Sequence, residues 1–92
     1  MGRFIVVCDY DGGTYVSQFD GHNAHDVARQ WAAMIRAHRP IPWSSGYIAD
    51  GVFRDLDDGL GPAAMDDIED AWQMGGRVGR AFYTATIVLQ SN

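Results

Sequence analysis

The sequence predicts an α+β fold for residues 1–92, in which two helices pack on one face of an antiparallel sheet. Apolar residues with a period of two occur at both ends of the chain, over residues 3–20 and 81–90, as strands require. Between these ends, apolar residues recur at helical spacing over residues 24–38 and 62–73. A chain of 92 residues corresponds to a single domain, and the predicted order of elements is β-β-α-(short β)-α-β.

The N-terminal segment predicts a β-hairpin. Residues 3–10 carry apolar side chains on both faces, which is typical of a strand inside a sheet. Asp11-Gly12-Gly13 is a turn sequence, because glycine adopts positive φ without a steric penalty. Residues 14–20 then predict the returning strand, since they are rich in β-branched and aromatic side chains.

The first predicted helix spans residues 24–38. Asn23 is a good N-cap residue, and Val27, Trp31 and Ile35 recur every four residues on its apolar face. Pro40 ends this helix, because proline disfavours helical backbone in the residue before it. Residues 40–62 are predicted to be an irregular loop that contains a short pair of strands, 47–49 and 52–53.

The second predicted helix begins at Pro62, since proline suits the first position of a helix. Gly75-Gly76 ends it, as glycine does after a last helical turn. Residues 81–90 alternate strictly and predict the closing strand. The apolar stripe of this second helix consists of Ala64, Met65, Ile68, Ala71 and Trp72.

Acidic residues are concentrated in one part of the chain. Residues 50–70 contain eight acids and one arginine, a formal charge of −7, whereas the rest of the chain sums to +2. In the predicted second helix, Asp66 and Asp70 are four residues apart, a spacing at which like charges repel. We therefore expect an acidic face that attracts a basic partner. Trp43 and Tyr47 are possible aromatic anchors beside it, because Trp and Tyr dominate interface hot spots. The predicted contact set is Asp55, Asp57, Asp58, Asp66, Asp67, Glu69, Asp70, Trp43 and Tyr47.

The sequence does not show the motif of a metal site. Asp55-x-Asp57-Asp58-Gly59 lacks the oxygen ligands that an EF-hand places before its glycine. His22 and His25 are separated by two residues, but zinc needs further ligands and no cysteine pair exists. We predict no metal and no cofactor.

Catalytic motifs are also missing. Ser44-Ser45-Gly46 is not a nucleophile elbow, and the single cysteine, Cys8, lies in an apolar strand where a buried thiol is expected. We predict that the chain is not an enzyme.

The same composition limits location and partners. No apolar stretch approaches the ~20 residues of a membrane span, and the run from Phe4 to Cys8 is too short for a secretory signal. A net charge of −5 disfavours direct binding of nucleic acid, which needs clustered bases. We expect a cytoplasmic protein whose partner is another protein.

The segment Gly13-Thr14-Tyr15-Val16-Ser17-Gln18, followed by Ala24 and Trp31, resembles small bacterial immunity proteins of polymorphic and contact-dependent-inhibition toxin systems. HicB-like antitoxin domains begin similarly. The resemblance implies an inhibitor that binds a cognate toxin, many of which are nucleases with basic grooves. An acidic patch would then occupy the groove in place of phosphate, with fast association.

The leading expectation is therefore a non-enzymatic inhibitor that neutralises a toxin through an acidic surface. Two other interpretations remain open besides a HicB-like antitoxin. One is a small enzyme or ligand-binding domain with a pocket between the sheet and the 40–62 loop. The other is an oligomeric component in which the closing strands of two copies pair edge to edge.

Overall fold

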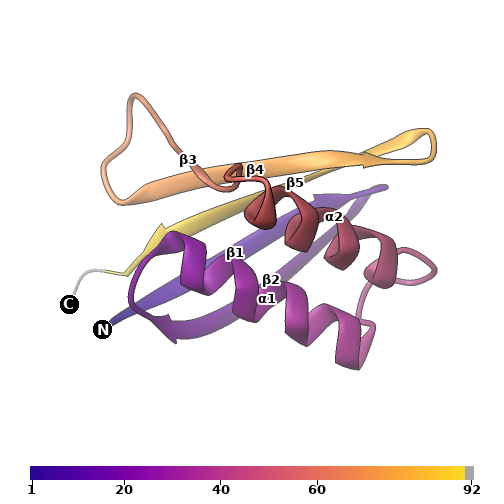
Figure 1. Ribbon diagram of the computed structural model, residues 1–92, viewed down its shortest axis with the longest axis horizontal. Helices are drawn as coiled ribbons and strands as arrows, with labels where there is room; N and C mark the ends of the chain where they lie inside the picture. The colour runs from indigo at the N-terminus through magenta and orange to yellow at the C-terminus, as the bar shows by residue number, and fades with distance from the viewer. Residues whose placement is uncertain (91–92) are drawn as a thin grey trace.

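Residues 1–90, the part of the chain that the computed structural model describes, form an α+β fold of one sheet and two helices (Figure 1). All neighbouring strands in the sheet are antiparallel, in the order β2-β1-β5-β4-β3. The predicted fold class is confirmed. In chain order the elements are β1 (Gly2–Tyr10), β2 (Gly13–Gly21), α1 (Ala24–His38), α2 (Ser45–Asp57), β3 (Ala63–Ala64), β4 (Ala71–Val78) and β5 (Ala81–Leu89).

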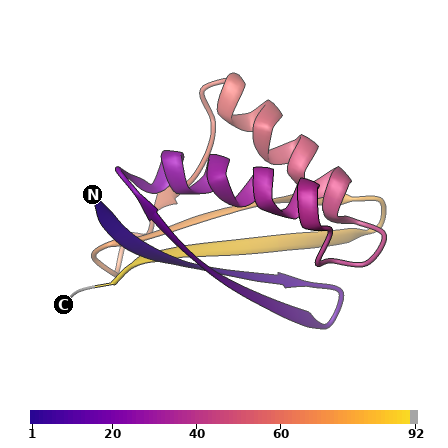
Figure 2. The ribbon, with the colours of Figure 1, turned by 90° about the horizontal axis from the view of Figure 1, so that it is seen from below.

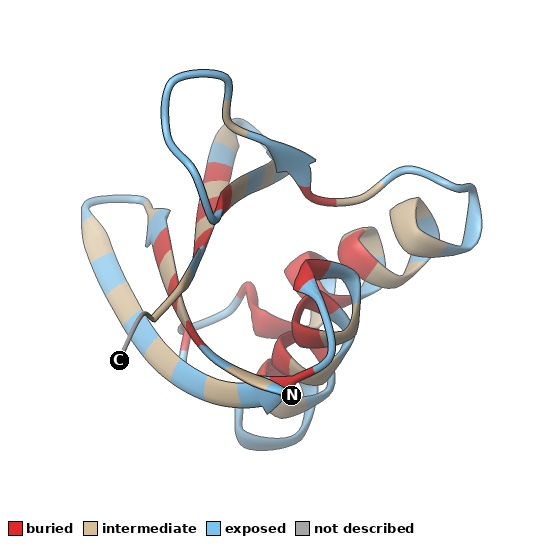
Figure 3. Cartoon of the chain, turned by 90° about the vertical axis from the view of Figure 1, so that its left-hand side faces the viewer, coloured by how far each residue is buried: buried red, intermediate tan, exposed pale blue. Residues whose placement is uncertain are grey.

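Both helices lie on the same side of the sheet (Figure 2). Helix α1 packs against β2, β1 and β5, and α2 packs against α1 and β4. Most of the buried residues, drawn in red in Figure 3, belong to one hydrophobic core. The sheet contributes Phe4, Val6, Cys8, Tyr83, Ala85 and Ile87 to this core, and the helices contribute Val27, Ala28, Trp31, Ile35, Ile48 and Val52, among others. In the part of the chain that the structure describes, the opposite face of the sheet carries no helix.

The first half of the chain follows the sequence prediction closely. The β1–β2 turn places Asp11 at φ 49° and Gly12 at φ 82°, so both central residues are in the left-handed region that a tight hairpin turn needs. Asn23 caps α1 through its side chain, which accepts a hydrogen bond of 2.8 Å from the backbone N–H of Asp26. Arg39 ends α1 at φ 51°.

The second predicted helix is wrong in position. Residues 62–73 contain strand β3, a loop and the start of β4, and Gly75-Gly76 lies inside β4 instead of ending a helix. Gly61 at φ 149° and Asp70 at φ 58° have non-helical backbones. The mutual repulsion expected among the acids of this segment works against a helix, and burial after Ala71 follows the two-residue alternation of a strand.

The second helix lies in the segment that was predicted to be irregular. Helix α2 covers both halves of the predicted strand pair 47–49 and 52–53, so that prediction is wrong. The buried residues Ile48, Ala49 and Val52 follow a helical spacing and pack against α1. The glycines at 46 and 51 weaken the intrinsic helix preference of this segment, and tertiary packing overrides that preference.

Strand β5 lies in the middle of the sheet, between β1 and β4. Both of its edges are paired, so β5 does not offer the free edge that the interpretation as an edge-to-edge oligomer requires. The strands at the two borders of the sheet are β2 and the two-residue β3.

Two glycines of these elements give opposite stability predictions. A Cβ at Gly51 in α2 would make ordinary contacts of 3.9 Å, so Gly51→Ala is expected to raise the free energy of unfolding by about 0.5–1 kcal/mol. A Cβ at Gly75 in β4 would stand 2.7 Å from the carbonyl oxygen of Tyr83, a fixed backbone atom. Gly75→Ala is therefore expected to lower the same free energy by about 1–3 kcal/mol. Urea denaturation checks both values, and a tolerated Gly75→Ala would contradict the close approach of β4 to β5.

Candidate functional site

The most exposed aromatic side chains lie where the chain passes from α1 into α2. Trp43 exposes 96% of its surface and Tyr47 exposes 69%. Tyr47, Asp50, Arg54 and Asp57 are all exposed and follow one another by three or four residues, which places them on one side of α2. We call these four residues, together with Trp43, the α2 stripe.

A rigid turn holds Trp43 outside the core. Ile41 is buried, and its backbone N–H donates a hydrogen bond of 2.8 Å to Oγ of Ser45. The Ser45 hydroxyl in turn donates to the carbonyl of Ile41 at 2.9 Å, and the hydroxyl of Ser44 donates to Oη of Tyr10 at 2.9 Å. These bonds fix the backbone on both sides of Trp43.

Trp43 itself has a strained backbone, with φ at 67°. The left-handed region costs a residue with a Cβ roughly 1–2 kcal/mol. The buried neighbours Ile41 and Ser45 impose this conformation, while the indole ring gains almost no contact within the chain. Such strain beside an unburied ring is typical of a binding position.

A shallow groove of about 460 Å³ is lined by Arg39, Trp43, Gly46, Tyr47 and Asp50. The carboxylate of Asp50 is already paired, because Arg36 donates a hydrogen bond of 2.6 Å to its Oδ1. The guanidinium of Arg36 also lies 4.5 Å from the ring centroid of Phe53. Within residues 1–90, Arg39 makes no ion pair. The exposure of Trp43 leaves the groove open to solvent, so it suits a protruding side chain of a macromolecule better than an enclosed metabolite.

The structure divides the predicted acidic residues into two groups. Asp57 ends α2 and Asp58 is its C-cap, whereas Asp55 is half-buried on the side of the helix nearer Tyr83. The other four acids lie in the β3–β4 connection, and we call residues 65–70 the acidic loop. Figures 2 and 3 show the end of α2 and the acidic loop well apart, on different sides of the molecule. One continuous acidic face is therefore not formed.

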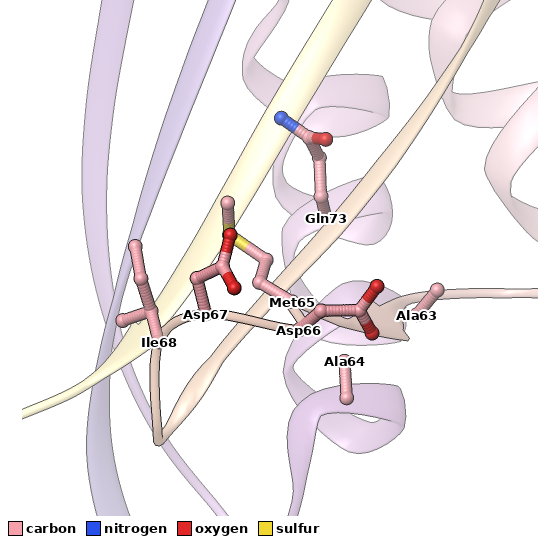
Figure 4. A pocket seen from close by; sticks show the side chains of 7 residues that line it. All are labelled: Ala63, Ala64, Met65, Asp66, Asp67, Ile68 and Gln73. Atoms are coloured by element: carbon pink, nitrogen blue, oxygen red, sulfur yellow. The ribbon is translucent and has the colours of Figure 1, made fainter.

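None of these seven carboxylates is neutralised within the described residues. The two ion pairs of residues 1–90 join Arg3 to Asp20 at 3.1 Å and Arg36 to Asp50 at 2.6 Å. The acidic loop lies beside a hollow of about 410 Å³, around which Figure 4 shows Asp66, Asp67, Ile68 and Gln73. The negative field of both acidic groups thus faces solvent.

Trp43 and Tyr47 can act together with Asp57 and Asp58. Asp57 lies ten positions after Tyr47 in α2, a rise of about 15 Å along the helix axis. A standard interface covers ~800 Å² on each partner, which is wide enough to include both ends of the helix. The acidic loop lies beyond that surface.

The sequence prediction named Trp43 and Tyr47 but missed Arg39 and Arg54. Because residues 45–57 were predicted to be irregular, the exposed side of a helix was not considered there. The repeat of Ile48, Val52 and Leu56 at four-residue intervals was the signal that could have revealed it.

Burial governs the chemistry of the only thiol. Desolvation, with a smaller contribution from the charge of Asp9, raises the pKa of Cys8 to about 11 from 9.0. Desolvation is also the largest cause for Tyr83, followed by the charge of Asp55, and raises its pKa to about 12 from 10.0. Both groups are therefore neutral at physiological pH, and a thiol in this state is a poor nucleophile.

These raised pKa values predict the alkaline stability of the protein. The unfolded chain loses both protons at lower pH than the folded chain, so their contribution is intact below about pH 9 and is lost as pH rises through 12. Each group contributes on the order of 2 kcal/mol. Urea denaturation from pH 7 to 11.5 checks the decline. At pH 8 a disulfide reagent should label Cys8 only after unfolding, and rapid labelling of the native protein would contradict the burial of its thiol.

Comparison with protein-family models, curated proteins and solved structures finds no significant match to this chain. Among the residues that the structure describes, no three His, Cys, Asp or Glu side chains are grouped to hold a metal ion. Neither helix within residues 1–90 is long and apolar enough to cross a membrane.

Proposed function

We propose that this protein is a non-enzymatic inhibitor that binds a protein with a basic surface, as an immunity protein binds its cognate toxin. The observation that carries the proposal is the exposure of Trp43 on a backbone held by buried hydrogen bonds. Hot spots of protein interfaces are enriched in Trp, Tyr and Arg, and all three occur on the α2 stripe and the adjacent groove.

The ordered turn around Trp43 supports a role in binding a partner, and it does not specify which activity of the partner is inhibited. The turn around Trp43 is ordered before the partner arrives, so little conformational entropy is lost on binding. The ring can enter a pocket of the partner while Arg39 and Tyr47 border it. Removal of an exposed indole ring from water provides a favourable term that the free protein does not use.

The unpaired acids at the end of α2 supply the charge. Asp57 and Asp58 have no cationic partner within residues 1–90, so a basic groove of a toxin would gain their field without first breaking an ion pair. Such carboxylates take the place of the phosphates that a nuclease groove attracts. Inhibition then requires only that the bound protein cover the groove.

The test starts from the product of the reading frame next to the gene. We expect the purified pair to form a complex in a titration at 150 mM salt, and the activity of that product to fall in proportion to the fraction bound. The double variant Asp57→Arg/Asp58→Arg should bind at least tenfold more weakly, mainly through a slower association rate.

Asp9→Arg/Asp11→Arg is the matched control, since it makes the same change of charge at the β1–β2 turn. This variant should bind the partner protein with most of the affinity of the wild type, because the α2 stripe is unchanged. Equal losses in the two double variants would show that net charge alone governs the association, and the proposed role of α2 would be wrong.

A further inference from the structure

The face of the sheet opposite the helices carries an exposed apolar centre. In the strand register, Val7 pairs with Val16 and Ile5 pairs with Val88 on this side. Val16 is 64% exposed and Val88 is 36% exposed. At one end of the same face, Phe82 pairs with Arg77 and is 67% exposed. No element within residues 1–90 covers these side chains.

Carboxylates border this apolar centre at two ends. Asp9 and Asp11 line a hollow of about 330 Å³ together with Phe82 and Thr84. At the β4 end, Asp66 and Asp67 of the acidic loop border the hollow of Figure 4 with Gln73. Gln73 pairs with Thr86 and Thr86 pairs with Val7, so this second hollow adjoins the same face of the sheet.

Basic residues balance the acids at one end of this face but not at the other. Arg3 is paired with Asp20 at 3.1 Å, so the two cancel. Arg77 lies 5.8 Å from the ring centroid of Phe82 and donates from Nε to the carbonyl of Gly79 at 2.8 Å. Arg77 and Arg80 offset Asp9 and Asp11 at the end of the two hairpin turns, whereas the acids of the acidic loop have no ion pair within residues 1–90. The face therefore has an apolar middle and a negative charge at the acidic-loop end, and its natural complement is apolar in the middle and positive at that end.

The size of the face fits one helix. Four strands, β2, β1, β5 and β4, span three strand spacings, or about 14 Å. An α-helix with its side chains is ~10–12 Å wide. A second copy of this chain is a poor occupant, because it would bring equal negative borders together in a protein whose net charge is already −5.

We infer that the helix-free face of the sheet is a second docking surface, and that it binds a cationic amphipathic helix of a partner protein. The helix would lie across Val7, Val16 and Val88 as α1 lies across the other face, with Lys or Arg side chains reaching Asp66 and Asp67 of the acidic loop. This inference concerns a surface separate from the α2 stripe and does not depend on it.

An NMR titration tests the inference with peptides as probes. The first is a 20-residue helix with Leu every three or four residues and Lys elsewhere. The second replaces every Lys with Glu, and the third keeps the lysines but replaces every Leu with Gln. We expect only the Leu/Lys peptide to bind, with the largest amide shifts at Val7, Val16, Thr86 and Val88.

Variants then separate this face from the rest of the molecule. Val16→Lys should weaken the Leu/Lys peptide at least tenfold, and its unfolding midpoint in urea should match the wild type, because Val16 is largely exposed. Trp43→Ala should leave the peptide affinity unchanged. Equal binding of the Gln-substituted peptide, shifts confined to α2, or light scattering that shows self-association abolished by Val16→Lys would each overturn the inference.

Discussion

Replacement of Trp31 with alanine is expected to lower the free energy of unfolding by about 3–5 kcal/mol. Trp31 is completely buried on α1, in the cluster formed by both helices and the sheet. Removal of the indole leaves a cavity that the other residues of this core, such as Ile35 and Val6, cannot fill without shifting. A domain of this size has a total stability of roughly 5–14 kcal/mol, so the variant should be close to unfolded. Circular dichroism during urea denaturation measures the loss.

Trp43→Ala is the matched control for that result, because it makes the same change at a position that is 96% exposed. Its effect on the free energy of unfolding should stay within about 0.5 kcal/mol. Similar losses at both positions would mean that Trp43 packs against the core in solution, and the anchor on the α2 stripe would not exist.

The double variant Trp43→Ala/Tyr47→Ala is expected to weaken partner binding at least hundredfold. Hot-spot aromatics contribute about 2 kcal/mol or more each when truncated, and 1.4 kcal/mol corresponds to a factor of ten. The loss should appear in the dissociation rate, since no charge is removed. Surface plasmon resonance with the immobilised partner gives both rates.

Trp43→Gly sharpens this prediction by separating binding from stability. Glycine adopts positive φ freely, so the variant relieves the backbone strain at φ 67° and should unfold at an equal or higher urea concentration than Trp43→Ala. It should nevertheless bind as weakly as Trp43→Ala. Retained affinity in either variant would contradict the role of the indole ring.

Local chemistry made the first half of the fold predictable. The turn Asp11-Gly12, the cap Asn23 and the stop at Pro40 act within a few residues, and each appears in the structure where the sequence placed it or within a residue of it. The alternation of residues 81–90 predicted a strand, since a period of two has no helical interpretation.

The second half depended on tertiary packing. Pro62, the apolar residues that follow and Gly75-Gly76 have the pattern of a helix, yet β4 forms there because Trp72 and Met74 pack beside Ile87 and Ala85 in the sheet. The glycines in α2 lower the intrinsic helix preference of this segment, so the sequence did not predict a helix there. The helix is stabilised by its contact with α1. Long-range pairings of this kind leave little trace in a single sequence.

The candidate site was also predictable only in part. The high negative charge of residues 50–70 was visible in the sequence, but its division between α2 and the acidic loop was missed because the second helix was misplaced. The exposure of Trp43 could not be predicted, because it depends on the hydrogen bonds between Ile41 and Ser45 and on the left-handed backbone between them.

Amide hydrogen exchange of the complex with the product of the neighbouring reading frame tests the central claim most directly. The account predicts that binding slows exchange in residues 39–58, around the turn at Trp43 and along α2, relative to the free protein. Protection confined to the helix-free face of the sheet, or no change over residues 39–58 in a saturated complex, would contradict the assignment of α2 as the inhibitory surface.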